Sequence, residues 1–132
     1  VIRTSIIGSE RHNKKSFLEW VKSNKSGTIN GYTNHYWNGV TCLQLAKIIH
    51  YIITNKSYWK GVRHVFSPNT VSKYELAECI NDIYNLHIKI TQYRTNETVN
   101  KTLKTDYSIL MESPPIQQQI REQFQFDKQY DL

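Results

Sequence analysis

The sequence is poor in cysteine, proline and glycine, and it contains no long hydrophobic run. Two of its 132 residues are cysteine, five are glycine and three are proline. Two cysteines at this spacing predict neither a disulfide framework nor a zinc site, so we expect Cys42 and Cys79 to be reduced core residues. Since no run of about 18 apolar residues is present, we expect no membrane-spanning helix.

Catalytic signatures are also missing from the sequence. It has no Gly-x-Gly-x-x-Gly turn, no phosphate-binding loop, no Gly-x-Ser-x-Gly elbow and no Tyr-x-x-x-Lys. The five histidines do not fall at metal-ligand spacing with other ligands. The sequence therefore predicts no catalytic residue and no metal site within this chain.

The beginning of the chain is unusual, because Val1 opens an apolar stretch that runs to Ile7. A free-standing domain rarely starts with a bare core strand, so we expect a portion of a longer protein. No charged-then-apolar segment of the secretory type stands at this end. We accordingly expect a cytoplasmic protein.

Positive charge is concentrated in the first half of the chain. Residues 1–73 hold eleven lysines and arginines against Glu10 and Glu19, whereas residues 74–132 hold six basic and nine acidic residues. This distribution favours an anionic ligand such as a nucleotide, a sugar diphosphate or a nucleic acid. A solvated, lysine-rich surface would give the same distribution, so charge alone does not distinguish an anion-binding protein from one with an ordinary basic surface.

The pattern of apolar residues predicts an α/β protein in which short strands alternate with helices. Strands are expected at 1–7, 26–32, 62–68 and 87–93. Helices are expected at 16–24, 41–55 and 72–85, followed by a loop at 94–106 and a last helix beginning near 114. Capping-box spacing at Thr41 and Gln44, and again at Ser72 and Glu75, marks two of the helix starts, and Ser16 is expected to cap the first helix. We expect residues 127–132 to fray.

A polar and aromatic cluster, residues 34–38, immediately precedes the second helix. The amides of Asn34 and Asn38 can bond hydroxyl groups, and the rings of His35 and Trp37 offer flat surfaces to a sugar or a base. Free N–H groups at the start of the following helix would favour a phosphate. The cluster is therefore either a binding site for a phosphorylated, hydroxyl-rich ligand or an ordinary loop.

A second cluster, "SYWKGVRH", gathers Tyr58, Trp59, Lys60 and Arg63. Aromatic and basic residues in alternation are typical of proteins that bind single-stranded nucleic acids. The same residues also suit a loop whose aromatic side chains cover the core. A small nucleic-acid-binding module therefore stays as the weaker alternative, and we regard nucleic acid as an unlikely partner.

Five segments occur in an order that resembles a known enzyme family. They are "VIRTSIIG", "SFLEWVKS", "NGYTNHYWNGVTCLQLAKII", "GVRHVFSPNTVSKYELAECI" and "NKTL". Together they resemble the C-terminal half of the dTDP-4-dehydrorhamnose reductase family, which are extended short-chain dehydrogenase/reductases. The resemblance covers residues 1–104 and implies one sugar-nucleotide-binding lobe over 1–132, with a helix and tail at 105–132. It also implies that a Rossmann half, carrying the catalytic Tyr and Lys and most of the NAD(P)H site, is missing here.

The resemblance implies two sets of site residues. The residues that it places beside the cofactor are Thr4 and Ser5. The residues that it places at the nucleotide sugar are Phe17, Leu18, His35, Trp37, Asn38 and Lys101. Lys101 stands where the family often has Arg, so it would carry the counter-charge without the bidentate fork.

The chain also departs from the family pattern. Ile6 and Ile7 stand where the family often has an aromatic pair, and Val40 stands where many relatives have proline. These departures leave the sugar and the nucleotide unspecified.

The leading hypothesis from the sequence is the substrate-binding part of an NAD(P)-dependent reductase of nucleotide-linked 4-keto-6-deoxyhexoses, as in rhamnose synthesis. The alternative is a non-catalytic relative that serves as a regulatory subunit. Either protein would partner a nucleotide sugar and its own N-terminal Rossmann half. Without that half, the lobe is expected to expose apolar surface and to self-associate.

Overall fold

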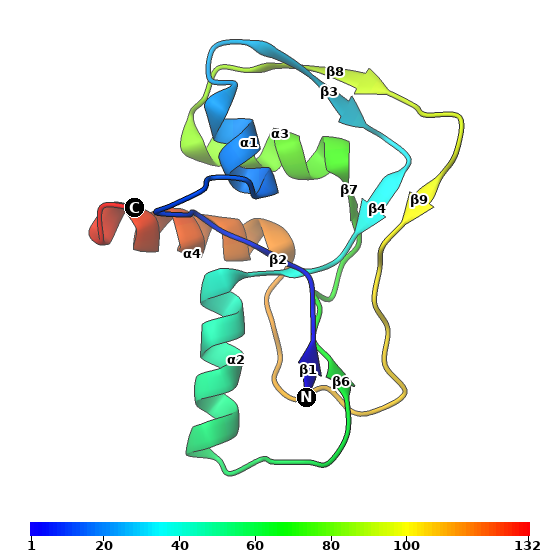
Figure 1. The fold of residues 1–132 in the computed structure, drawn as a ribbon, viewed down its shortest axis with the longest axis vertical. Coiled ribbons are helices and arrows are strands. Elements are labelled where there is room, and N and C mark those ends of the chain that lie inside the picture. Colours follow the sequence, from blue (N-terminus) through cyan, green and yellow to red (C-terminus); the bar gives the residue numbers. More distant parts are fainter.

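The computed structural model describes residues 1–132, and it confirms the α/β class (Figure 1). Four helices make up most of the regular secondary structure: α1 (Phe17–Ser23), α2 (Cys42–Thr54), α3 (Lys73–Tyr84) and α4 (Ile116–Gln129). The nine strands are short: β1 (Ile2–Arg3), β2 (Ile6–Ile7), β3 (Thr28–Tyr32), β4 (His35–Trp37), β5 (Val40–Thr41), β6 (Arg63–His64), β7 (Val71–Ser72), β8 (Lys89–Tyr93) and β9 (Val99–Asn100). None of the helices combines the length and the apolar character needed to cross a membrane.

The strands form four small sheets rather than one large one. Parallel pairs join β1 with β6, β2 with β5, and β3 with β8, while β4 lies between β7 and β9. The predicted strand 1–7 is split because its partner changes: Ile2 faces Arg63, whereas Ile6 faces Val40. Between the two strands, the Thr4 hydroxyl donates to the carbonyl of Val65 at 2.7 Å.

Two segments expected to be loops contain strands. Residues 35–37 form β4, which pairs antiparallel with β7 and parallel with β9. The polar segment 94–106 contains β9, because Val99 and Asn100 lie beside His35 and Tyr36. Tertiary pairing has overridden the weak local strand preference of both segments.

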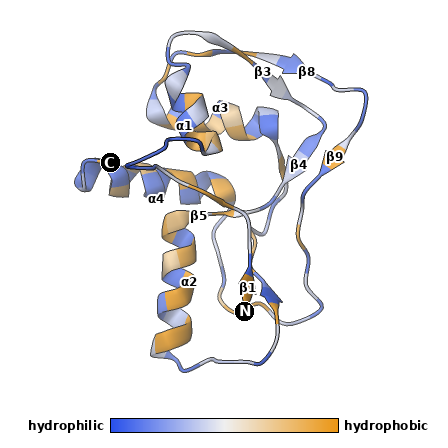
Figure 2. Cartoon of the chain, in the orientation of Figure 1, coloured by the Kyte–Doolittle hydropathy of each residue, from blue (hydrophilic) through white to orange (hydrophobic).

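The hydrophobic interior consists of two clusters of very different size. The large core holds 13 buried residues: Ile7, Leu18, Val21, Ile29, Trp37, Val71, Leu76, Ala77, Ile80, Leu86, Ile88, Ile116 and Ile120. The small core holds four, which are Val40, Ile48, Ile52 and Val65. The large core lies among α1, α3, α4 and β3, and the small core lies beside α2 at the opposite end of the molecule (Figures 1 and 2).

The helix starts confirm three sequence predictions. Ser16 caps α1 by accepting from the Glu19 N–H, and Ser72 and Glu75 form a reciprocal capping box at α3. Thr41 caps α2 by accepting from the Gln44 N–H at 3.1 Å, but the capping box predicted there is not formed, because the Thr41 N–H donates to Gln119 instead of Gln44. These caps are local interactions that help to fix where each helix begins.

The C-terminal helix is more firmly held than its sequence suggests. Asp127 is 3% exposed and accepts hydrogen bonds from Ser9, from the Tyr84 hydroxyl at 2.8 Å and from the Gln123 amide at 2.8 Å. Burial, with the Asp127 carboxylate beside it, raises the pKa of Tyr84. The prediction that residues 127–132 fray is therefore wrong for its first three positions, since α4 runs on to Gln129.

The two cysteines differ in their burial. Both are free, but only Cys79 packs against the large core. Cys42 is exposed as the first residue of α2, so its prediction as a core residue is wrong.

Candidate functional site

A cleft of about 540 Å³, here called the main cleft, opens along β4. Its wall includes Tyr36 of β4 and Val99 of β9, and Ile6 and Ile7 of β2 complete an apolar side. The strand pairs described above bring these elements together, because β4 binds β9 on one edge and β7, which leads into α3, on the other.

Five of the eight predicted site residues line the main cleft. They are Ser5, Phe17, His35, Trp37 and Lys101. The other three have structural environments: Leu18 is 2% exposed within the large core, and the Thr4 hydroxyl bonds Val65. Asn38 is buried and exchanges two hydrogen bonds of 2.8 Å with the backbone of Leu103.

The polar and aromatic cluster therefore has two roles. His35, Tyr36 and Trp37 line the main cleft. Asn34 is 1% exposed, and its amide bonds the backbone at Thr95, so it holds the turn that leads into β9. Asn34 and Asn38 thus hold neighbouring backbone segments in place, while the three ring-bearing residues between them line the cleft.

Trp37 is positioned by a hydrogen bond and by a close backbone approach. Its indole Nε1 donates to Ser5 Oγ at 2.7 Å, and the residue is 4% exposed. The ring lies so close to Gly39 that a Cβ there would overlap both the ring and the Ser5 carbonyl oxygen. Glycine is therefore required at position 39 for the indole to reach Ser5 and close one side of the cleft.

Two lysines give the main cleft its charge. Lys73 of α3 and Lys101 both line it, no acidic residue does, and neither lysine takes part in an ion pair. Lys73 Nζ lies 4.4 Å from the centre of the Phe17 ring. Burial, and secondly the positive charge of Lys101, lower the pKa of Lys73. Two like charges held together at an aromatic wall favour an anion between them.

Lys73 lines the cleft although the sequence did not predict it as a site residue. The sequence did indicate that Lys73 is the first residue of a helix, because it directly follows Ser72 of the capping box. What the sequence did not reveal is the pairing of Ser72 with Tyr36, which brings that helix start to the cleft.

The start of α2 is not the free helix terminus that the sequence suggested. The Thr41 N–H donates to Gln119 Oε1 at 3.2 Å, and the Leu43 N–H donates to Gln123 Oε1 at 3.0 Å. Because α4 supplies these acceptors, the N–H groups expected to hold a phosphate are already bonded. That interpretation is wrong, and the lysines replace the helix terminus as the positive element.

A second hollow, here called the side pocket, adjoins the main cleft and has a volume of about 230 Å³. It shares Phe17, His35 and Lys73 with the main cleft, and it adds Trp20, Asn30 and Tyr32. The two hollows therefore meet at one cationic and two aromatic side chains.

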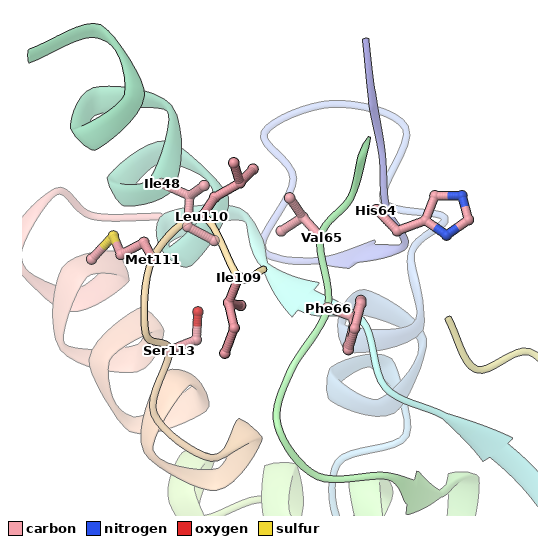
Figure 3. A pocket seen from close by; sticks show the side chains of 8 residues that line it. All are labelled: Ile48, His64, Val65, Phe66, Ile109, Leu110, Met111 and Ser113. Atoms are coloured by element: carbon pink, nitrogen blue, oxygen red, sulfur yellow. The ribbon is translucent and has the colours of Figure 1, made fainter. Parts of the chain in front are cut away.

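The other end of the molecule also has hollows, and an open one of about 570 Å³ lies along α2, lined among others by Lys47, His50 and Tyr51. A cavity beside the small core, lined by Ile48, Val65 and Leu110 among others, has a volume of about 20 Å³ (Figure 3). That volume holds about one water molecule. In the segment "SYWKGVRH", Trp59 packs against the small core, and the Arg63 guanidinium lies 4.2 Å from the centre of the Tyr107 ring. No group of His, Cys, Asp and Glu side chains is placed to hold a metal ion.

Comparison with known proteins gives matches in structure only. No family model and no curated protein sequence matches the chain. A dTDP-4-dehydrorhamnose reductase from Bacillus anthracis, in complex with NADP, is similar over 95% of this chain and 47% of its own, with a TM-score of 0.75 and 16% identity. The Clostridium acetobutylicum reductase of the same name is similar over 96% and 48%, with a TM-score of 0.69 and 16% identity.

A third structure extends the likeness beyond the reductases of that name. The GDP-L-fucose synthetase of Naegleria fowleri, bound to NADP, is similar over 97% of this chain and 44% of its own, with a TM-score of 0.68 and 13% identity. The chain spans about half the length of these solved structures. The family resemblance predicted from the sequence is thus confirmed at the level of the fold.

Proposed function

We propose that this chain is the substrate-binding part of an NAD(P)-dependent reductase of nucleotide-linked 4-keto-6-deoxyhexoses, of the kind that forms dTDP- or UDP-rhamnose. The observation that supports the proposal most directly is the main cleft, in which Lys73 and Lys101 stand unpaired among aromatic side chains. A diphosphate with a sugar attached needs this combination of charge and flat apolar surface. The solved structures with this fold are named as enzymes of such compounds.

In this proposal the diphosphate lies between the two lysines. Each ammonium group is a compact charge with several donors, so two of them hold a diphosphate without fixing its rotation. The sugar lies toward Trp37 and Tyr36, whose rings cover its apolar faces. Ser5 Oγ, which already accepts from Trp37, still has its own hydrogen to donate to a hydroxyl.

The residues of this chain could form only a small part of an NAD(P)H site. Ser5 faces the cleft, whereas the Thr4 hydroxyl is engaged with Val65, and the sequence offers no glycine-rich turn for a pyrophosphate. The cofactor, which supplies hydride to the sugar ketone, would therefore be held mainly by an N-terminal Rossmann half. The contribution of this chain is to position the sugar, which is a substantial part of the rate of such reactions.

The outer face of α2 is where we expect that Rossmann half to bind. A hollow of about 250 Å³ there is lined entirely by apolar residues, among them Val1, Ile49, Ile53 and Tyr58. The adjacent two-stranded sheet of β1 and β6 has unpaired outer edges to which further strands can add.

The experiment is a calorimetric titration of this chain with dTDP-glucose and UDP-glucose at about 50 mM salt, where charge attraction is weakly screened. We expect Lys101→Ala and Lys73→Ala each to weaken binding about tenfold, the loss of one charge-assisted contact. Lys104→Ala is the matched control, since Lys104 is exposed and does not line the cleft. Absence of binding, or equal affinities for all three variants, would contradict the proposal.

A non-catalytic regulatory relative would pass that binding test. NADPH oxidation by the longer protein, with a 4-keto sugar nucleotide as substrate, separates the two possibilities. We expect oxidation, and a regulatory subunit would show none.

A further inference from the structure

Gln119 is a polar residue within an apolar face of α4. Its side chain is fully buried, at 0% exposure, and Ile116 and Ile120 beside it belong to the large core. An apolar side chain would fill this position without the cost of removing an amide from water. The amide is therefore explained by the groups that it bonds.

The amide of Gln119 uses its acceptor and both of its donor hydrogens. Oε1 accepts from the Thr41 N–H at 3.2 Å, and Nε2 donates to Ser67 Oγ at 2.9 Å and to the Pro114 carbonyl at 2.8 Å. One side chain thus joins the end of β5 to the segment that follows β6. Neither Gln119 nor any of these three partners lines the main cleft.

Ser67 links Gln119 to the backbone at Gly39. A serine hydroxyl has one hydrogen to donate, and the Gln119 amide already approaches Ser67 Oγ as a donor. The hydroxyl hydrogen therefore points away from Gln119, and it is donated to the Gly39 carbonyl at 2.6 Å. The Ser67 N–H donates to the Asn38 carbonyl at 2.7 Å, so Ser67 holds two successive carbonyl groups.

The peptide group between Gly39 and Val40 extends this connection to the cleft. Because a peptide group is planar, fixing the Gly39 carbonyl also fixes the direction of the Val40 N–H. That N–H donates to the Ser5 carbonyl at 2.9 Å. Ser5 lines the main cleft, and its Oγ accepts from the Trp37 indole at 2.7 Å. A continuous series of hydrogen bonds therefore runs from α4 to the two residues that close one side of the cleft.

We propose that Gln119 is a positioning residue of the main cleft, which holds Ser5 and the Trp37 indole in place from behind the wall. It acts through Ser67 and the peptide group that follows Gly39. The role rests on the function proposed above, in which the sugar lies toward Trp37. Gln119 itself touches no ligand.

This role has different consequences for the two parts of a ligand. Lys73 begins α3 and Lys101 follows β9, so the two charges are placed by elements that Gln119 does not bond. Loss of the Gln119 contacts should therefore impair binding of the sugar and spare binding of the diphosphate.

Gln123, one turn further along α4, offers a matched control. It is 5% exposed, accepts from the Leu43 N–H at 3.0 Å and donates to Asp127 at 2.8 Å. Both glutamines thus bond the start of α2, but Gln123 has no bond to Ser67. Gln119→Met and Gln123→Met each remove a buried amide and keep the length of the side chain, so both should lower the melting temperature.

The first measurement is the binding of UDP-glucose and of inorganic pyrophosphate, by calorimetry. We expect Gln119→Met and Ser67→Ala each to weaken UDP-glucose binding about fivefold, the effect of one lost hydrogen bond, and to leave the affinity for pyrophosphate unchanged. Gln123→Met should keep the wild-type affinity for both ligands. Ser67→Ala removes a single oxygen atom, so it tests the same connection even if Gln119→Met does not fold.

The second measurement needs no ligand. The Trp37 indole N–H donates to Ser5, so its proton chemical shift in the NMR spectrum reports the geometry of this wall. We expect the signal to move in Gln119→Met and in Ser67→Ala, and to keep its wild-type position in Gln123→Met.

The two measurements separate this proposal from the proposed function. If UDP-glucose binds but Gln119→Met and Gln123→Met weaken it equally, or if the Trp37 signal does not move in Ser67→Ala, Gln119 is a packing residue and the proposed function stands. If the wild-type chain binds neither ligand, the proposed function fails. A Trp37 signal that moves in Gln119→Met and Ser67→Ala alone would then still support the positioning of the wall by Gln119.

Discussion

The region around the large core and the region around the small core cover their apolar residues to very different extents. Three helices and the β3–β8 pair enclose the 13 residues of the large core. The small core has four buried residues, and beside it Ile49, Ile53 and Tyr58 are 40%, 58% and 67% exposed. Figure 2 shows apolar residues along most of α2.

The large core is therefore well covered within this chain, whereas the region around the small core leaves apolar side chains exposed. The main cleft and the side pocket are built on elements that enclose the large core, so their geometry depends little on a partner. An apolar face of the kind that α2 exposes is instead typical of an interaction surface. The proposed docking face on α2 is therefore separate from the walls of the two hollows.

The largest expected effect tests whether the large core carries the stability. Leu76, on α3, is 1% exposed, so Leu76→Ala leaves a cavity and should lower the free energy of unfolding by about 2–5 kcal/mol. Ile53→Ala, on the exposed face of α2, should change it by no more than about 0.5 kcal/mol. Urea unfolding followed by circular dichroism measures both, and equal losses would remove the distinction between the two regions.

The next effect concerns the link between the regions. Asn38 bonds the backbone of Leu103, just before the chain passes to the small core, and both partners are left unsatisfied in Asn38→Ala. We expect a loss of about 1–3 kcal/mol in the free energy of unfolding. Asn30→Ala, at an exposed and unbonded asparagine, is the control and should cost about 0.5 kcal/mol or less. If the two variants are equally stable, Asn38 does not join the regions.

A third effect depends on pH and belongs to the large-core region. The Tyr84 hydroxyl donates to Asp127, and burial first and Asp127 second raise the pKa of Tyr84 above the ordinary 10.0. The folded state therefore keeps a proton that the unfolded chain releases near pH 10. The contribution of this group is complete below that pH and is lost as the pH rises towards the raised pKa.

Thermal unfolding above pH 10 measures this effect. We expect the melting temperature of the wild type to fall more steeply with pH than that of Tyr84→Phe. Tyr107→Phe, in the region of the small core, should keep the wild-type slope. A Tyr84→Phe variant with an unchanged slope would contradict the prediction.

The last prediction concerns self-association through the exposed face of α2, where substitutions should affect the stability of the fold least. We expect the isolated chain to self-associate through this face, and Ile49→Lys with Ile53→Lys should weaken the association at least about tenfold. Asp82→Lys, at an exposed position of α3, is a control for the added charge. Light scattering across a wide concentration range measures the association, and a wild type that stays monomeric throughout would contradict the expectation.

The sequence predicted local features well because capping and apolar spacing are local properties. Ser16, Thr41 and Ser72 marked the starts of α1, α2 and α3 from neighbouring residues alone. Features set by distant contacts were missed. Local sequence does not show that β4 is a strand or that Lys73 reaches the cleft, because both follow from pairing with residues far along the chain.

The same limit explains the error at α2. The acceptors that bond its N–H groups come from Gln119 and Gln123, on a helix more than half the chain away. The family resemblance predicted more of the cleft residues than the local pattern did. It named Ser5, Phe17 and Lys101, which lie far apart in the sequence and all line the main cleft.

The pairing of β4 also has a consequence for how the chain is made. Tyr36 lies opposite both Ser72 and Asn100, so the wall of the main cleft joins three widely separated segments. Contacts between distant segments form late, and a chain leaving the ribosome cannot complete this wall until the residues around Lys101 have emerged. A nascent chain would thus present Lys73 and the aromatic rings before the second charge arrives. The proposed diphosphate site would then assemble only after Lys101 has left the ribosome.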